Sequence, residues 1–184
     1  SSSAARFVLD LAPRTTALRA LVASFFAPLL FYVPTLSGAG YWLDGDEFVA
    51  VGATLGISHP PGHPLYAVLT RAVQLLPLGD LAFRTALGSA LALALTSVLL
   101  CGVALSLFAR LGETGAGGAL LAFGAAACAS LTQPSWFQAV RPEVYALASA
   151  AAAAVLYGLA SGRLVLAAFA FGLVQLLFIV NVFW

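Results

Sequence analysis

The sequence predicts an all-α, polytopic membrane protein with about five transmembrane helices and one interfacial helix in the first extracytoplasmic loop. Of its 184 residues, 62% are hydrophobic and 8% are charged, whereas soluble domains average about 45–50% apolar and about 25% charged residues. The mean hydropathy is +1.02. The charged residues separate uncharged runs that are long enough to cross a hydrocarbon core of ~30 Å. We therefore interpret residues 1–184 as a single membrane domain and, since it contains no methionine, as an excerpt of a longer protein or a processed product.

The first run follows a polar segment. Residues 1–19 carry four charged side chains and Pro13, and are expected to form a cytoplasmic lead. Residues 20–37 are uncharged and predict the first transmembrane helix, bent at Pro28 and ending near Pro34. A cleaved signal peptide is the alternative, but the run is long and aromatic, contains two prolines, and lacks a small-x-small cleavage site.

Residues 38–84 are expected to form an extracytoplasmic loop that contains an amphipathic helix. Over residues 64–78 the apolar side chains recur at helical spacing, while Thr70, Arg71 and Gln74 fall elsewhere on the helix. This pattern is typical of a helix that lies at the membrane interface.

Four further uncharged runs predict the remaining spans. The clearest has 25 residues between Arg84 and Arg110. The next run ends in the polar, proline-broken stretch TQPSWFQAV, so its helix is expected to stop near Leu131. The expected spans are 85–109, 114–131, 144–162 and 164–184, with an extracytoplasmic loop at 132–143.

The arginines orient the chain. With the N-terminus in the cytoplasm, five arginines lie inside and three outside, as the positive-inside rule requires. Those inside are Arg6, Arg14, Arg19, Arg110 and Arg163, and those outside are Arg71, Arg84 and Arg141. The loop 38–84 and the segment 132–143 then leave the membrane on the same extracytoplasmic face. Two polar, proline-broken segments at one membrane surface favour a functional site there.

The side chains that could take part in acid–base or ligand chemistry are concentrated in residues 41–66, which hold three of the seven acidic residues and both histidines. Nucleic acid is excluded as a partner, because a net charge of +1 provides no basic face to neutralise phosphates. The two cysteines, Cys101 and Cys128, lie inside apolar runs and are read as small buried side chains.

Three stretches of the sequence resemble a known family. They are DGDEFVAVGATLGISHPPGHPLY, LPLGDLAFR and SWFQAVRPEVYAL. They resemble the N-terminal region of a family of polytopic membrane proteins, formerly of unknown function, whose animal member is an endoplasmic-reticulum protein O-mannosyltransferase. The resemblance covers about residues 20–160 and places the chain in the GT-C class of glycosyltransferases. The matching positions are Asp44, Glu47, His59, Pro60, Pro61, Gly62, Pro64, Leu65, Trp136, Glu143, Val144 and Tyr145.

The resemblance implies a membrane enzyme that moves a sugar, such as mannose, from a polyprenyl-phosphate donor to a hydroxyl of a protein or glycan acceptor on the extracytoplasmic face. Such a reaction needs a general base for the acceptor hydroxyl and positive charge for the leaving phosphate. The candidate catalytic residues are Asp44, Glu47 and Asp46. Asp46 stands where the family has glycine, which leaves open which aspartate acts. The candidate substrate-binding residues are His59, Arg84, Arg141, Glu143, His63, Trp136 and Tyr145.

Other interpretations of these residues stay open. A divalent metal ion could be held by oxygen ligands of the three acids, although no complete ligand set is visible. The acids could equally solvate a loop, Arg141 and Glu143 could form a structural pair, and Trp136 could belong to an aromatic belt.

The alternative function is that of a non-catalytic polytopic membrane subunit or a transporter fragment. A transporter should carry charged residues or broken helices near mid-membrane, whereas the acids here lie at the ends of segments. The chain is expected to be an integral membrane protein of the bacterial inner membrane, embedded in membrane lipid, with its site facing outward.

Overall fold

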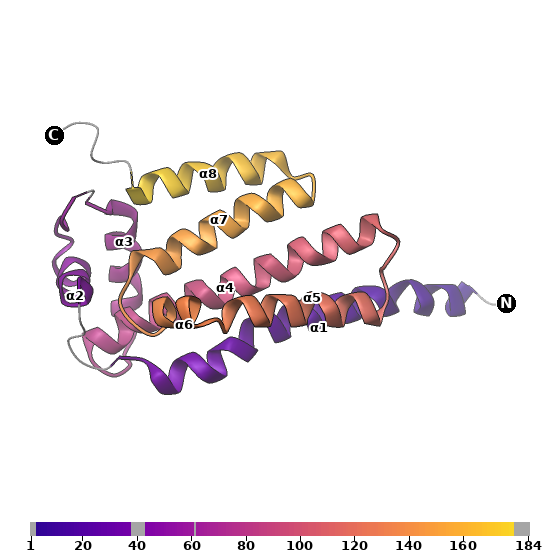
Figure 1. The fold of residues 1–184 in the computed structure, drawn as a ribbon, viewed down its shortest axis with the longest axis horizontal. Coiled ribbons are helices and arrows are strands. Elements are labelled where there is room, and N and C mark those ends of the chain that lie inside the picture. Colours follow the sequence, from indigo (N-terminus) through magenta and orange to yellow (C-terminus); the bar gives the residue numbers. More distant parts are fainter. Residues whose placement is uncertain (1–2, 38–42, 61, 179–184) are drawn as a thin grey trace.

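The computed structural model describes residues 3–37, 43–60 and 62–178, and every regular element in these ranges is helical (Figure 1). The all-α class is therefore confirmed. The helices are α1 (Ser3–Tyr32), the 3₁₀ turn η1 (Val33–Thr35), α2 (Gly45–Thr54), α3 (Pro64–Gln74), α4 (Leu81–Arg110), α5 (Ala116–Ser130), α6 (Gln133–Ala139), α7 (Val144–Ala160) and α8 (Leu164–Phe178).

Two of the described helices are long and apolar enough to cross a membrane. They are the 22-residue segment Arg14–Thr35 and the 30-residue helix α4. A third crossing results if α5 and α6, which meet at a bend of 70°, form one broken span. Helices α7 and α8 are apolar, but their described lengths are 17 and 15 residues, below the ~20 residues of an untilted span. The protein is thus a helical membrane protein, and the expected count of five spans is not confirmed.

Small side chains allow the long helices to pack closely. Ala90 and Ala94 of α4 and Ala146 and Ala153 of α7 are all buried, and α4 and α7 contact each other along their length. Small residues bring helix backbones together where lipid supplies no hydrophobic driving force. Helix α1 joins this core through Tyr32, which is fully buried and donates its hydroxyl to the Ser130 carbonyl at the end of α5.

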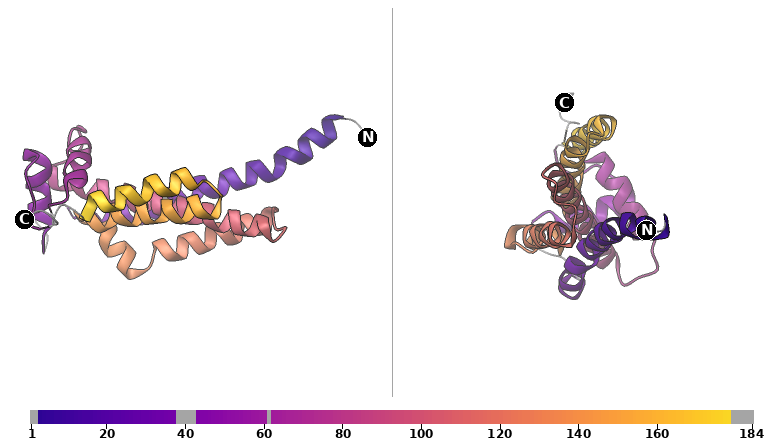
Figure 2. Two further views of the ribbon diagram at one scale, coloured as in Figure 1. Left: turned by 90° about the horizontal axis from the view of Figure 1, so that it is seen from above. Right: turned by 90° about the vertical axis from the view of Figure 1, so that its right-hand side faces the viewer.

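Helices α2 and α3 form a cap across one end of the bundle, opposite the N-terminal end of α1 (Figure 2). They cross so tightly that a Cβ on Gly52 would lie 2.4 Å from the Thr70 side chain. Gln74 then ties the cap to the bundle, because its amide donates to the Val49 carbonyl of α2 and to the Thr85 hydroxyl of α4.

The cap contains one correction to the sequence analysis. Asp46 and Glu47 were expected in an acidic loop, whereas they occupy the first turn of α2. Two physical reasons account for this helix. Carboxylates near a helix N-terminus interact favourably with the helix dipole, and Phe48 and Val51, three residues apart, are both buried on one face. The amphipathic helix expected over 64–78 corresponds to α3.

Candidate active site

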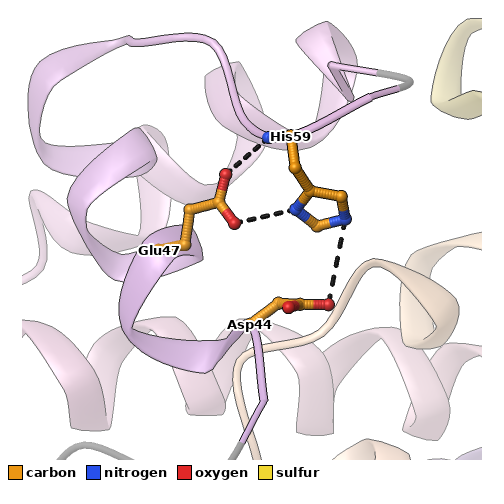
Figure 3. Close-up of side chains that lie close together, drawn as sticks. All are labelled: Asp44, Glu47 and His59. Atoms are coloured by element: carbon orange, nitrogen blue, oxygen red, sulfur yellow. Dashed lines mark hydrogen bonds and ion pairs between the residues drawn. The ribbon is translucent and has the colours of Figure 1, made fainter.

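Three polar side chains of the cap converge on one point (Figure 3). Asp44 is the N-cap residue of α2, Glu47 lies in its first turn, and His59 follows in the connection to α3. The Nδ1 atom of His59 lies 2.7 Å from Oε2 of Glu47, and its Nε2 atom lies 3.8 Å from Oδ2 of Asp44. The imidazole is therefore placed between two carboxylates; these residues are called the Asp44–Glu47–His59 cluster below.

The backbone of the α2–α3 connection explains how residues 12 positions apart meet. Asp44 and Glu47 are three residues apart at a helix start, so they share a face. Helix α2 ends at Leu55 in the left-handed conformation, with φ of 53°, which turns the chain back along the helix. The backbone N–H of His59 then donates to Oε1 of Glu47. The carboxylate of Glu47 thus contacts both the backbone N–H and the ring Nδ1 atom of His59.

This contact shifts the pKa values of both partners. Partial burial acts to raise the pKa of Glu47, but the hydrogen bonds from His59 prevail and lower it below its ordinary value. The hydrogen bond to Glu47 is the largest influence on His59, and together with the negative charges of Glu47 and Asp44 it raises the pKa of His59 despite burial. The pair thus favours an ionised Glu47 and a protonated His59.

Asp44 is the most accessible member of the cluster. Its side chain is 51% exposed, against 38% for Glu47 and 40% for His59. Its distance from the imidazole is beyond hydrogen-bond range, so its carboxylate can accept a proton from a substrate.

The cluster is also the place where the described residues could hold a metal ion. One ligand atom from each of its three residues lies within 4.8 Å of the others. Two carboxylates and an imidazole suit a divalent ion such as Zn²⁺ or Mn²⁺, provided that His59 gives up its shared proton. From the sequence, Asp44, Asp46 and Glu47 were the possible oxygen ligands, whereas the structure brings His59 to Asp44 and Glu47.

A second group lies nearby at the link between α6 and α7. Arg141 and Glu143 are both buried, and their Nη2 and Oε2 atoms are 3.4 Å apart. The Arg141 guanidinium lies 4.2 Å from the ring centroid of Phe137 and donates to Gln138. Its Nε and Nη1 groups have no hydrogen-bond partner in the described part of the chain.

The two groups influence each other electrostatically. Glu143 lies outside the spanning segments, at the N-cap of α7. Burial raises its pKa, the charge of Arg141 opposes this, and the charge of Asp44 raises it further. The two polar segments therefore converge at one end of the bundle, as the sequence analysis expected. No ion pair joins Asp44 or Glu47 to Arg84 or Arg141 among the residues that the structure describes.

Arg84, a candidate substrate-binding residue from the sequence, contacts backbone carbonyls in the structure. Its guanidinium donates to the carbonyls of Gln74, Leu78 and Gly79. These carbonyls end α3 and form the turn into α4, where a cation stabilises the helix C-terminus. Arg84 is therefore a structural cap on α3.

His63 also lies outside the cluster. It is the N-cap residue of α3, is 3% exposed, and has its Nδ1 atom 2.5 Å from the Leu177 carbonyl. Its ring packs edge-on against Phe48. These contacts join the cap to the end of α8.

The remaining candidates are more exposed. Asp46 is exposed, and although it adjoins Glu47 it is not among the three residues whose ligand atoms come together. Trp136, on α6, is 41% exposed and donates to Thr35, and Tyr145, on the first turn of α7, is 53% exposed. Sequence reasoning missed Tyr66 and Ser89, which lie beside Glu143; the only signal was a polar residue at position 89, within an apolar span.

Comparisons with known proteins agree with the resemblance noted in the sequence. The model of the family described as the protein O-mannosyl-transferase TMEM260 N-terminal domain matches residues 44–179. The protein O-mannosyl-transferase TMEM260 of Mus musculus is 33% identical over 135 residues, which cover 73% of this chain and 18% of the mouse protein. The chain thus spans less than a fifth of the length of this relative. No solved structure matches the chain.

Proposed function

Because this chain belongs to the family of the protein O-mannosyl-transferase TMEM260 N-terminal domain, we propose that it is the N-terminal part of a GT-C-type membrane glycosyltransferase. The enzyme transfers a sugar, such as mannose, from a polyprenyl-phosphate donor to a hydroxyl of a protein or glycan acceptor. The observation that carries this proposal is the Asp44–Glu47–His59 cluster, which lies at the start of the region that the family model matches.

In this proposal Asp44 is the general base. Its carboxylate is the most exposed of the cluster and can reach an acceptor hydroxyl, as a general base must. Glu47 is a positioning residue, because it holds both the backbone and the ring of His59. A protonated His59 then places positive charge 3.8 Å from the carboxylate of Asp44.

Arg141 is the proposed ligand for the donor phosphate. Two of its N–H-bearing nitrogens have no partner in the described residues, and guanidinium binds phosphate in a bidentate manner. Since both nitrogens are buried, donor binding requires a shift of the α6–α7 link. Arg141 is preferred to Arg84 for this role, because each guanidinium nitrogen of Arg84 already donates to a backbone carbonyl.

The arrangement in the membrane completes the proposal. We infer five crossings, with α7 and α8 as the fourth and fifth, and a site on the extracytoplasmic face as the arginines indicate. The relative comes from mouse, so the bacterial inner membrane expected from the sequence has no support from it.

The test is a transfer assay with the full-length protein in detergent or liposomes. Labelled mannose is supplied either as mannosyl polyprenyl phosphate or as a nucleotide sugar, with a folded protein acceptor. Transfer is expected from the lipid-linked donor alone. Transfer from the nucleotide sugar alone would contradict the donor, and no transfer from either would favour a non-catalytic membrane subunit.

A further inference from the structure

A small pocket lies behind the cluster, where the cap meets the bundle. It is half open, has a volume of about 50 Å³, and is formed by α3, α4 and the start of α7. Its lining residues include four that bear hydroxyl groups, Tyr66, Thr70, Thr85 and Ser89, and one that bears a carboxylate, Glu143. Phe48 separates it from His59, since its ring centroid lies 4.9 Å from Tyr66 and 5.9 Å from His59.

Tyr66 contributes a buried hydroxyl that has polar neighbours but no hydrogen bond of normal geometry among the described residues. The residue is 5% exposed, and its hydroxyl lies beside Thr70 and Ser89. Nevertheless, that hydroxyl makes no hydrogen bond of normal geometry with the described residues. A buried hydroxyl without a partner is unfavourable, so a group that pairs with it in the pocket would be stabilised.

Glu143 contributes the matching acceptor. Its carboxylate lies 3.4 Å from Arg141 and near the backbone N–H of Val144. Because a carboxylate has about four lone-pair positions, it can accept at least one more donor. Ser89 fixes this residue, because the backbone N–H of Glu143 donates to the Ser89 hydroxyl.

The chemistry of the pocket selects a neutral alcohol. An aliphatic hydroxyl both accepts and donates, so it can accept from Tyr66 and donate to Glu143. A phosphate fits poorly, because the residues that line the pocket include one carboxylate and no cation. The volume of about 50 Å³ exceeds the ~10–15 Å³ that one water needs and suits a hydroxymethyl or hydroxyethyl group whose remainder leaves through the open side.

We propose that this pocket is a hydroxyl-binding subsite, in which Tyr66 donates to, and Glu143 accepts from, an alcohol group of a substrate. The inference rests on the proposed glycosyltransferase function and adds a place for a substrate hydroxyl next to the cluster. The alcohol can come from two sources, a Ser or Thr side chain of a polypeptide acceptor or a hydroxyl of the sugar.

Binding is tested without turnover, on the full-length protein in detergent. N-acetylthreonine amide and methyl α-mannoside serve as the two probes in saturation-transfer NMR. Tyr66→Phe removes only this hydroxyl. It is expected to weaken the binding of one probe by about 2- to 10-fold, the range of a single neutral hydrogen bond, and to leave the melting temperature of the protein unchanged. Tyr157→Phe is the matched control, because that hydroxyl contacts Arg163 at the other end of the bundle. The probe that responds identifies the source of the alcohol.

A second pair of variants fills the pocket. Gly88 lines the pocket, and a Cβ there would lie 3.6 Å from Val73, which is an ordinary van der Waals distance. A Cβ is therefore tolerated, and the longer side chain of Gly88→Leu is expected to fill the cavity. Gly124→Leu is the control, because a Cβ at Gly124 has no neighbour within 4 Å. Binding of the responding probe is expected to be lost in Gly88→Leu and kept in Gly124→Leu.

The outcomes separate the subsite from the proposed function. If neither probe responds to Tyr66→Phe or Gly88→Leu, the pocket holds water only and the subsite is wrong, even when sugar transfer persists. If one probe responds but no transfer occurs with any donor, the subsite stands and the proposed function fails. In the active enzyme, Tyr66→Phe should raise KM for the substrate that carries the alcohol more than it lowers kcat.

Discussion

Glu47 holds His59 through both of its carboxylate oxygens. Oε1 accepts from the histidine backbone N–H, and Oε2 lies 2.7 Å from the ring Nδ1 atom. This double contact fixes the position and the tilt of the imidazole, so that Nε2 faces Asp44. Glu47, a catalytic candidate from the sequence, thus positions His59. The ring of His59 in turn lies beside Asp44.

The first prediction concerns the titration of His59. Because its pKa is raised, the contribution of this contact to stability is complete below the ordinary histidine value of about 6.5 and is lost as the pH rises through the folded value. The lowered pKa of Glu47 adds a contribution that is lost as the pH falls through its folded value. Glu47→Gln should therefore lower the pKa of His59, as measured by NMR of its ring protons.

The control for this titration is Asp46→Asn, which removes the neighbouring exposed charge outside the cluster. It should change the His59 titration much less than Glu47→Gln. Equal effects of the two substitutions would mean that general negative charge, and not the specific contact, raises the pKa of His59.

Hydropathy predicted the long helices because their apolar runs decide their structure. Helix α4 (Leu81–Arg110) includes the whole expected span 85–109. Helix α2 was missed, since its short apolar face, with Phe48 and Val51, follows two acids and contains glycine. The expected lead and the first expected span share one helix, because α1 is continuous from Ser3 to Tyr32.

The site was predicted less completely than the fold. The stretch that contains the cluster was identified, but the contact between Glu47 and His59 depends on a turn at Leu55, which composition does not reveal. Arg84 shows the same limit. From sequence alone, an arginine that caps a helix looks the same as one that binds phosphate, because the difference lies in which carbonyls the fold places around it.

The second prediction concerns the buried pair of Arg141 and Glu143. Arg141→Met leaves Glu143 without its counter-charge, and breaking a buried pair typically destabilises by about 3–5 kcal/mol. Burial already raises the pKa of Glu143, so the neutral acid, which needs no partner, forms as the pH falls. Arg141→Met should therefore lower the melting temperature more at pH 8 than at pH 5. In Arg141→Met/Glu143→Gln the pH dependence should disappear; if it persists, another group is responsible.

The third prediction concerns topology. Asp46, in the first turn of α2, and Gly115, the N-cap residue of α5, are both exposed. Helix α2 and the connection from α4 to α5 lie at opposite ends of the bundle (Figure 1). In a Cys128→Ser background, which removes the exposed native thiol, Asp46→Cys should react with an impermeant thiol reagent from outside. Gly115→Cys should react only after permeabilisation. Labelling of both from the same side would contradict the proposed orientation.

The last prediction distinguishes the two aspartates in the full-length enzyme. Asp44→Asn keeps the shape of the side chain but removes its ability to accept a proton, which for general-base catalysis typically lowers the rate by about 10²- to 10⁴-fold. Asp46→Gly removes an exposed acid outside the cluster and should leave most of the transfer rate intact. The transfer rate of Glu47→Gln should lie between those of the two aspartate variants, because the amide still accepts from the His59 backbone but no longer favours the protonated ring.

The measurement is the initial rate of sugar transfer from a polyprenyl-phosphate donor, with melting temperatures to confirm folding. Normal transfer by Asp44→Asn together with an inactive Asp46→Gly would assign the base to Asp46, and would mean that the cluster positions His59 for another purpose.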